Sequence, residues 1–137
     1  MTSTDTITII VPGVPVPKGR PRFSNGQIHP DPKSAKYEKI IELHARAAMR
    51  GRPPFEAAVS VAVLALIPIP ASWSKRRRNE AARGLIKPIS RPDADNYLKI
   101  VDGLNGVVWR DDAQACDVFL KKRYSTEPSL TILVSRI

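Results

Sequence analysis

The chain has 137 residues, of which 42% are hydrophobic and 26% are charged, a composition that indicates one folded domain and excludes an intrinsically disordered protein. Its 22 Lys and Arg against 13 Asp and Glu give a net charge of +9, so we expect a polyanionic partner, most often nucleic acid. The single cysteine, Cys116, excludes an internal disulfide and a zinc site built from several cysteines, and we expect it to be a small buried residue in a reducing compartment.

Apolar periodicity and turn residues divide the chain into the elements of a single α+β domain. The first long helix has the clearest signals, because Asp31 suits its N-cap, Pro32 its first turn and Gly51 its end. The apolar run before Pro68 is too short to cross a bilayer and predicts a buried strand. In chain order we expect a strand at 7–11, a functional loop at 12–30, a helix at 31–50, a strand at 59–67, helices at 74–83 and 95–104, an extended segment at 107–109, a turn at 111–112, and strands at 116–124 and 130–137.

Five of the thirteen acidic residues lie within the 22 positions that begin at Arg91 and end at Asp112. A helix N-cap explains one of Asp93 and Asp95, and Asp111 with Asp112 suits an ordinary turn. These structural explanations do not account for the rest of the cluster, so we consider a chemical role.

Asp95, Lys99 and Asp102 have the spacing of one helical face, away from the apolar side. Carboxylates at a helix start and on a later turn can converge on one point, where they require a cation to stay charged. Three or four such oxygen ligands suit Mg²⁺ or Mn²⁺. An EF-hand is excluded, because Leu98 and Leu104 stand where its loop needs Gly and Glu. A metal held by carboxylates in a basic protein predicts phosphodiester hydrolysis, with a non-catalytic basic DNA-binding domain as the alternative.

The segment RPDADNYLKIVDGLNGVVWRDDAQ resembles the signature of the RusA family of Holliday-junction resolvases. The matching residues are Arg91, Pro92, Asp93, Asp95, Asn96, Lys99, Asp102, Leu104, Asn105, Gly106, Asp111, Asp112 and Gln114. Tyr97 departs from the pattern, because the family usually has Leu there. The earlier stretch VPGVPVPKGRPRFSNGQIHPDPKSAKYE is similar to the family's segment before its first helix, and the likeness is weakest at 51–87.

This resemblance implies a homodimer of single α+β domains, each spanning residues 1–137 with a mixed sheet and packed helices. It implies an endonuclease that nicks four-way DNA junctions symmetrically with Mg²⁺ or Mn²⁺ in recombination and repair, in the bacterial cytoplasm and of phage or prophage origin. An alternative is a nuclease for flaps, forks or other branched DNA, which would share the same residues. The site that the resemblance implies has Asp93, Asp95 and Asp112 as metal ligands, Asp111 as a further candidate ligand, Lys99 as the catalytic lysine, and Asn96 and Asp102 as supporting residues.

Several basic residues are candidates for phosphate contacts, namely Lys18, Arg20, Arg22, Lys75, Arg76, Arg77, Arg78 and Arg91. The run at 18–22 is favoured, because its prolines restrict the backbone and the family shares it. In a third run, the alternation of a strand sends Lys121 and Arg123 to one face and Lys122 to the other. Phe23 and Trp73, which lie beside the first two runs, could stack on or wedge between bases, or could pack against the domain.

Overall fold

The structure is a computed structural model that describes residues 5–137, with the side chain of Asp102 left out of the description. Its elements are β1 (Thr6–Pro12), β2 (Arg22–Ser24), β3 (Gln27–His29), α1 (Pro32–Met49), β4 (Val59–Pro68), α2 (Lys75–Ala82), α3 (Ala94–Lys99), β5 (Ala115–Ser125) and β6 (Ser129–Arg136), with short 3₁₀ helices η1 (Ile100–Leu104) and η2 (Asp112–Gln114). The predicted single α+β domain with a mixed sheet is confirmed. None of the described helices is both long and apolar enough to cross a membrane.

Four strands form the main sheet in the order β1-β6-β4-β5. β4 and β5 run parallel, whereas β6 is antiparallel to both β1 and β4. Parallel neighbours need a long crossover, and the segment between β4 and β5 supplies it with α2, α3 and η1. The crossover therefore carries the acidic motif back along the sheet.

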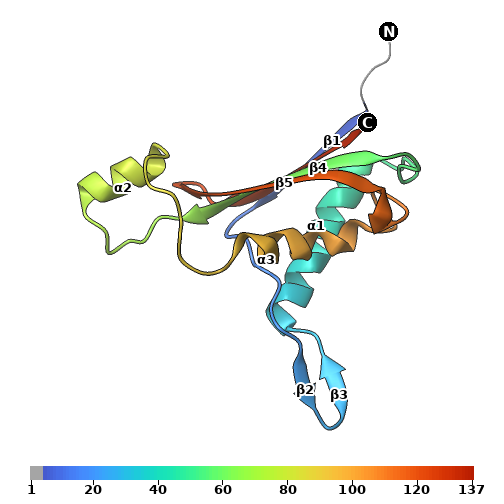
Figure 1. Ribbon diagram of the computed structural model, residues 1–137, viewed down its shortest axis with the longest axis horizontal. Coiled ribbons are helices and arrows are strands. Elements are labelled where there is room, and N and C mark those ends of the chain that lie inside the picture. The colour runs from blue at the N-terminus through green and yellow to red at the C-terminus, as the bar shows by residue number, and fades with distance from the viewer. Residues whose placement is uncertain (1–4) are drawn as a thin grey trace.

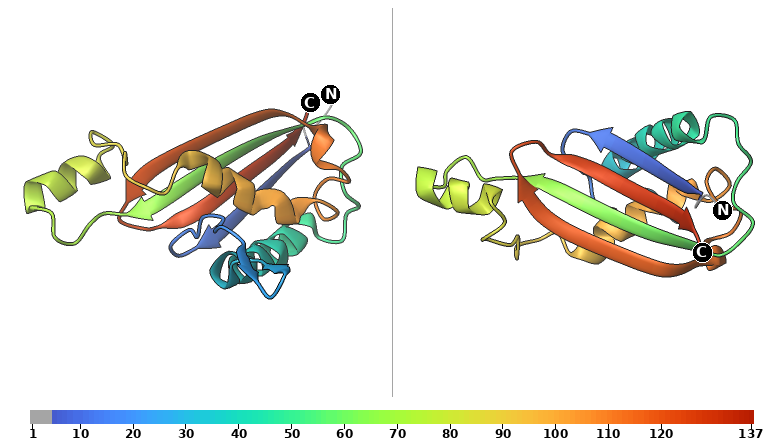
Figure 2. Two further views of the ribbon diagram at one scale, coloured as in Figure 1. Left: turned by 60° about the horizontal axis from the view of Figure 1, so that its bottom comes forward. Right: turned by 90° about the horizontal axis from the view of Figure 1, so that it is seen from above.

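Helices α1 and α3 cover one face of this sheet, and no described helix lies over the other face (Figures 1 and 2). Alternate side chains of β1, β4 and β6 point to the covered face, where they pack against both helices. The fully buried part of this core includes Ile9, Ile41, Val59, Val61, Ile100, Leu104, Leu130, Ile132 and Val134. The core thus fixes α3 against the sheet.

The start of α1 follows the predicted capping signal, because the Asp31 carboxylate accepts a hydrogen bond from the Ser34 N–H at 3.0 Å. The helix ends at Met49, and its C-cap is Arg50, with a left-handed φ of 51°, one residue before the predicted stop at Gly51. The Ser74 hydroxyl accepts from the Arg77 N–H at 3.2 Å to start α2. Helix α2 projects beyond one end of the sheet (Figure 1).

The segment 12–30 was predicted as a loop, and that prediction missed a β-hairpin. Strands β2 and β3 pair in register, with Phe23 opposite Ile28. The connection is a type I′ turn, because Asn25 and Gly26 both have positive φ, 52° and 72°. The Asn-Gly dipeptide is a strong hairpin signal that could have predicted it.

Three other expectations need correction. The helix expected at 95–104 is α-helical only to Lys99 and continues as the 3₁₀ helix η1. Of the segment 107–109, Val107 and Val108 form a turn, because their N–H groups both donate to the carbonyl of Leu104, and only Trp109 is bridged, to Phe55 and Asn105. Cys116 is exposed and not buried; it lies in the exposed first half of the edge strand β5, where the register with β4 shifts.

Candidate active site

Helix α3 and the loop before it carry the first part of the acidic motif. Lys122 of β5 donates from Nζ to the carbonyl oxygens of Ser90 and Pro92, each at 2.9 Å. This bonding agrees with the predicted alternation, which sends Lys122 away from Lys121. The sequence placed Lys122 only in the third basic run and gave it no role near the acidic motif, but it holds the backbone directly before Asp93.

Asp93 is the N-cap residue of α3, yet its side chain makes no capping hydrogen bond. Asp95 lies in the first turn of α3, where the helix dipole favours a negative charge. Its Oδ2 lies 3.5 Å from Lys99 Nζ, and the two side chains are 63% and 60% exposed. Such an exposed pair is weak, so both groups remain available to a ligand. The predicted placement of Asp95 and Lys99 on one helical face is confirmed.

Asp112 lies at the start of η2 beside a buried tryptophan. Its Oδ1 accepts a hydrogen bond from Trp109 Nε1 at 2.8 Å. Its neighbour Asp111 instead caps η2, with Oδ1 accepting from the Ala113 N–H at 3.0 Å. Asp112 therefore has an oriented carboxylate with a second oxygen left over, whereas the geometry of Asp111 fits the cap better than it fits a metal ligand.

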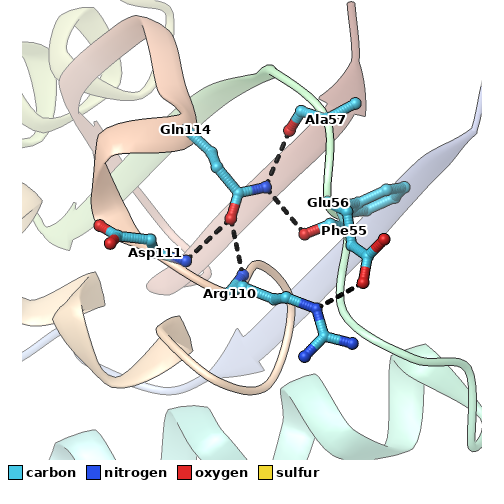
Figure 3. A network of polar contacts seen from close by, with 6 residues as sticks. All are labelled: Phe55, Glu56, Ala57, Arg110, Asp111 and Gln114. Atoms are coloured by element: carbon cyan, nitrogen blue, oxygen red, sulfur yellow. Dashed lines mark hydrogen bonds and ion pairs between the residues drawn. The ribbon is translucent and has the colours of Figure 1, made fainter.

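Gln114 connects this acidic turn to the segment that leads into β4. Its amide oxygen accepts hydrogen bonds from two backbone N–H groups, and its amide nitrogen donates to two backbone carbonyls. The four partners are the N–H groups of Arg110 (2.9 Å) and Asp111 (2.8 Å) and the carbonyls of Phe55 (2.8 Å) and Ala57 (2.9 Å) (Figure 3). All the hydrogen-bonding positions of the amide are used, so the side chain holds the turn that carries Asp112.

Two further hydrogen bonds join the same two segments. Arg110 Nε donates to Glu56 Oε1 at 2.7 Å (Figure 3), and the backbone N–H of Phe55 donates to the carbonyl of Val108 at 2.7 Å. The motif match included Gln114 without a role, and its partners at 55–57 could not be inferred, because they lie far away in the sequence.

A cavity of about 160 Å³ lies beside this turn, where α3 and η1 meet the sheet. Asp112 lines it together with Val61, Leu98, Val101, Trp109, Ala115 and Val118. The structure therefore brings Asp112 to the same cavity as the last turn of α3. Asp93 and Asp95 do not line it.

The donor chemistry of the site fits a hard divalent cation, because uncommitted carboxylate oxygens are the ligands that Mg²⁺ prefers. Among the described residues, however, no three His, Cys, Asp or Glu side chains lie close enough together to hold one ion. The convergence of Asp93, Asp95 and Asp112 on a metal stays a prediction, and the side chain of Asp102 lies outside the description.

The candidate phosphate contacts lie on separate parts of the molecule. Lys18 pairs with Glu38 of α1, whereas Arg20 and Arg22 are exposed at the hairpin, and Arg91 is exposed before α3. The run of Lys75, Arg76, Arg77 and Arg78 forms the start of α2.

Trp73 packs against the domain. The Arg77 guanidinium lies 3.9 Å from the centre of the Trp73 ring, and that ring meets Tyr124 of β5 edge-on at 5.2 Å. These contacts favour the packing interpretation of Trp73 over stacking on bases.

Tyr97, where the motif departs from the family pattern, is buried in α3. Burial raises its pKa. Burial, with a smaller contribution from Tyr97, also raises the pKa of Tyr37 to about 12. The Tyr37 hydroxyl is buried and has no hydrogen-bond partner in the described part of the chain. The interface between α1 and α3 therefore contains an unpaired polar group.

Comparisons with known proteins agree with the motif. The family model of the endodeoxyribonuclease RusA matches residues 12–135, a range that includes every candidate site residue. The chain is also similar to "Uncharacterized protein YqaN" of Bacillus subtilis (strain 168), with 38% identity over 139 residues that cover 97% of this chain and 98% of the relative.

Proposed function

Because the chain belongs to the RusA endodeoxyribonuclease family, we propose that it resolves Holliday junctions by nicking four-way DNA at symmetric positions. The observation that carries the proposal is the family match over 12–135, which includes the whole acidic motif. The net charge of +9 supports a DNA substrate.

The proposed metal ligands are Asp93, Asp95 and Asp112, with Mg²⁺ or Mn²⁺ as the cation. When bound, the ion would supply an activated water and neutralise charge on the phosphate. The missing cap bond of Asp93 supports this role, because its carboxylate is not used to stabilise the helix. The Trp109 N–H supports it for Asp112 by orienting that carboxylate.

Lys99 is proposed to stabilise negative charge on the scissile phosphate. Its ammonium lies one helical turn after Asp95 and forms only a long, exposed ion pair with it, so little energy holds it away from a phosphate. The proposed assembly is a homodimer, because a two-fold symmetric substrate matches an isologous dimer with two equivalent sites.

The test is cleavage of a synthetic four-way junction, a flap and a plain duplex in Mg²⁺ and in Mn²⁺. Paired symmetric nicks in the junction, with little cutting of the duplex, are expected. Preferential cutting of the flap would instead favour the alternative of a nuclease for other branched DNA. No cutting in either metal would leave only a DNA-binding role. Sedimentation of the free protein should give about twice the chain mass of 15.1 kDa.

A further inference from the structure

The β2–β3 hairpin projects from the body of the molecule near the start of α1 (Figure 1). Each of its strand residues is exposed. Phe23 and Ile28 are a cross-strand pair, so their side chains lie on one face of the hairpin. These two large apolar side chains are 75% and 68% exposed, although exposure of neighbouring apolar groups is unfavourable in water.

Contacts at its base fix this hairpin to both helices. The Lys18 N–H donates to the carbonyl of Asn96 in α3 at 2.9 Å, and the Lys18 ammonium pairs with Glu38 in α1. Gly19 lies so close to Asp31 that an added Cβ would be 2.5 Å from its carboxyl group. A free two-stranded hairpin is marginally stable in water, so these anchors hold the apolar pair at a set position relative to α3.

The surroundings of the hairpin are basic. Both nearby acids are engaged, because Asp31 caps α1 and Glu38 pairs with Lys18. At the hairpin and in the first turns of α1, the exposed cations for which the described part of the chain provides no salt bridge include Arg20, Arg22, Lys33 and Lys36. This local charge favours an anionic partner at the hairpin over the same basic face of a second copy, so we place the interface of the proposed homodimer elsewhere.

We propose that the Phe23–Ile28 face contacts unstacked bases at the branch point of DNA while Arg20 and Arg22 contact the adjoining phosphates. This inference rests on the proposed function and specifies how the substrate is recognised. Every base has a π face, so stacking on an aromatic ring detects unpaired bases with little regard to sequence. Because the hairpin base is bonded to Asn96, next to Asp95, the contact sets the distance from the branch point to the acidic end of α3.

The experiment uses a four-way junction with 2-aminopurine at the branch point, in EDTA so that no strand is cut. Binding of the wild-type protein should raise the fluorescence, because the base becomes unstacked. Phe23→Ala should lose this rise and bind the junction about five- to hundredfold more weakly, as expected for one lost base contact, with less than about a twofold change for linear duplex. Phe23→Trp should keep the rise.

Phe119→Ala is the matched control, because Phe119 of β5 is also an exposed aromatic residue, at 61%, and lies outside the hairpin. It should behave as wild type. Circular dichroism of each variant checks folding, and Ile28→Ala is a second probe of the same face if Phe23→Ala is misfolded.

The inference is overturned if neither hairpin variant changes the fluorescence, or if Phe119→Ala changes it equally. It is also overturned if the hairpin variants lower the sedimenting mass, because the face would then cover a second copy. These measurements are made in EDTA and do not depend on cleavage of the DNA. A protein that unstacks the branch point but never cuts it would contradict only the proposed function, and one that cuts junctions with the bases stacked would contradict only this inference.

Discussion

The buried indole of Trp109 donates a hydrogen bond from Nε1 to Oδ1 of Asp112 at 2.8 Å. Trp109 is only 3% exposed, so a residue of the core sets the direction of a carboxylate at the surface. Backbone contacts hold Trp109 in turn, because its carbonyl accepts from the Gly106 N–H at 2.7 Å.

This hydrogen bond predicts a role for Trp109 in the activity. Trp109→Phe should lower cutting or metal affinity by about 10- to 100-fold, as found when a group that orients a metal ligand is removed. Cleavage rates over a Mn²⁺ titration, and Mn²⁺ binding followed by electron paramagnetic resonance, measure both quantities. Trp73→Phe is the control, because Trp73 packs on Tyr124 away from Asp112. Equal losses in the two variants would contradict the prediction.

Asp93→Asn, Asp95→Asn and Asp112→Asn should each nearly abolish cutting, because each removes a proposed metal ligand. Junction binding should stay the same or become tighter, since negative charge near the phosphates is removed. Cleavage and gel-shift assays on one junction separate the two effects. Asp111→Asn should retain much more activity, because the Asp111 side chain caps η2. A ligand variant that cuts normally would remove its residue from the proposed set.

The Gln114 network predicts a large effect from replacing one amide nitrogen by an oxygen. Gln114→Glu places a carboxylate against the carbonyls of Phe55 and Ala57, which now receive hydrogen bonds. We expect a loss of about 1–3 kcal/mol in the free energy of unfolding, measured by urea denaturation, together with slower cutting.

Glu56→Gln is the matched control for Gln114→Glu. It weakens the Arg110 ion pair, whose side chains are 58% and 71% exposed, and it leaves the Gln114 hydrogen bonds in place. Its effect should stay below about 1 kcal/mol. If both variants unfold at the same urea concentration, Gln114 does not hold the acidic turn.

Lys99→Ala tests a catalytic role against a structural one. As a group that stabilises charge on the phosphate, Lys99 should contribute on the order of 10²–10³ in rate, with thermal stability near wild type because its ion pair with Asp95 is exposed. Lys99→Arg should rescue poorly, since a planar guanidinium does not replace a compact ammonium. Full recovery of Lys99→Ala at higher Mg²⁺ would show that the lysine only organises the metal site.

Tyr37→Phe tests the unpaired hydroxyl between α1 and α3. At pH 7 the variant should be about 1 kcal/mol more stable, because a buried group without a partner is removed. Burial raises the pKa of Tyr37 from 10.0 to about 12, so the folded state favours the neutral phenol. The raised pKa has no effect on stability below about pH 10. As the pH rises toward 12, Tyr37 ionises more readily in the unfolded state, and the wild-type protein loses about 2 kcal/mol in the free energy of unfolding. Urea denaturation from pH 8 to 12 should therefore show a widening gap in favour of Tyr37→Phe, and a constant gap would contradict this.

The sequence by itself determined the features whose causes are local. The boundaries of α1 and α2 follow from Asp31, Ser74 and their neighbours, because a cap needs only a side chain and a backbone N–H a few residues away. The acidic motif, and with it the family, could also be identified from the sequence, because a long pattern of spaced residues is specific without coordinates. The hairpin was missed even though its Asn-Gly signal is local.

Only the tertiary structure decided which side chains are available and which are used in packing. Trp73 and Phe23 both lie beside basic residues in the sequence, yet Tyr124 of β5 covers Trp73, whereas Phe23 lies on a hairpin that projects into solvent. Gln114 acquired a role only when the fold brought 55–57 beside it. The physical reason is the same in each case, because exposure and hydrogen bonding depend on segments that are distant in the chain and adjacent only after the sheet has formed.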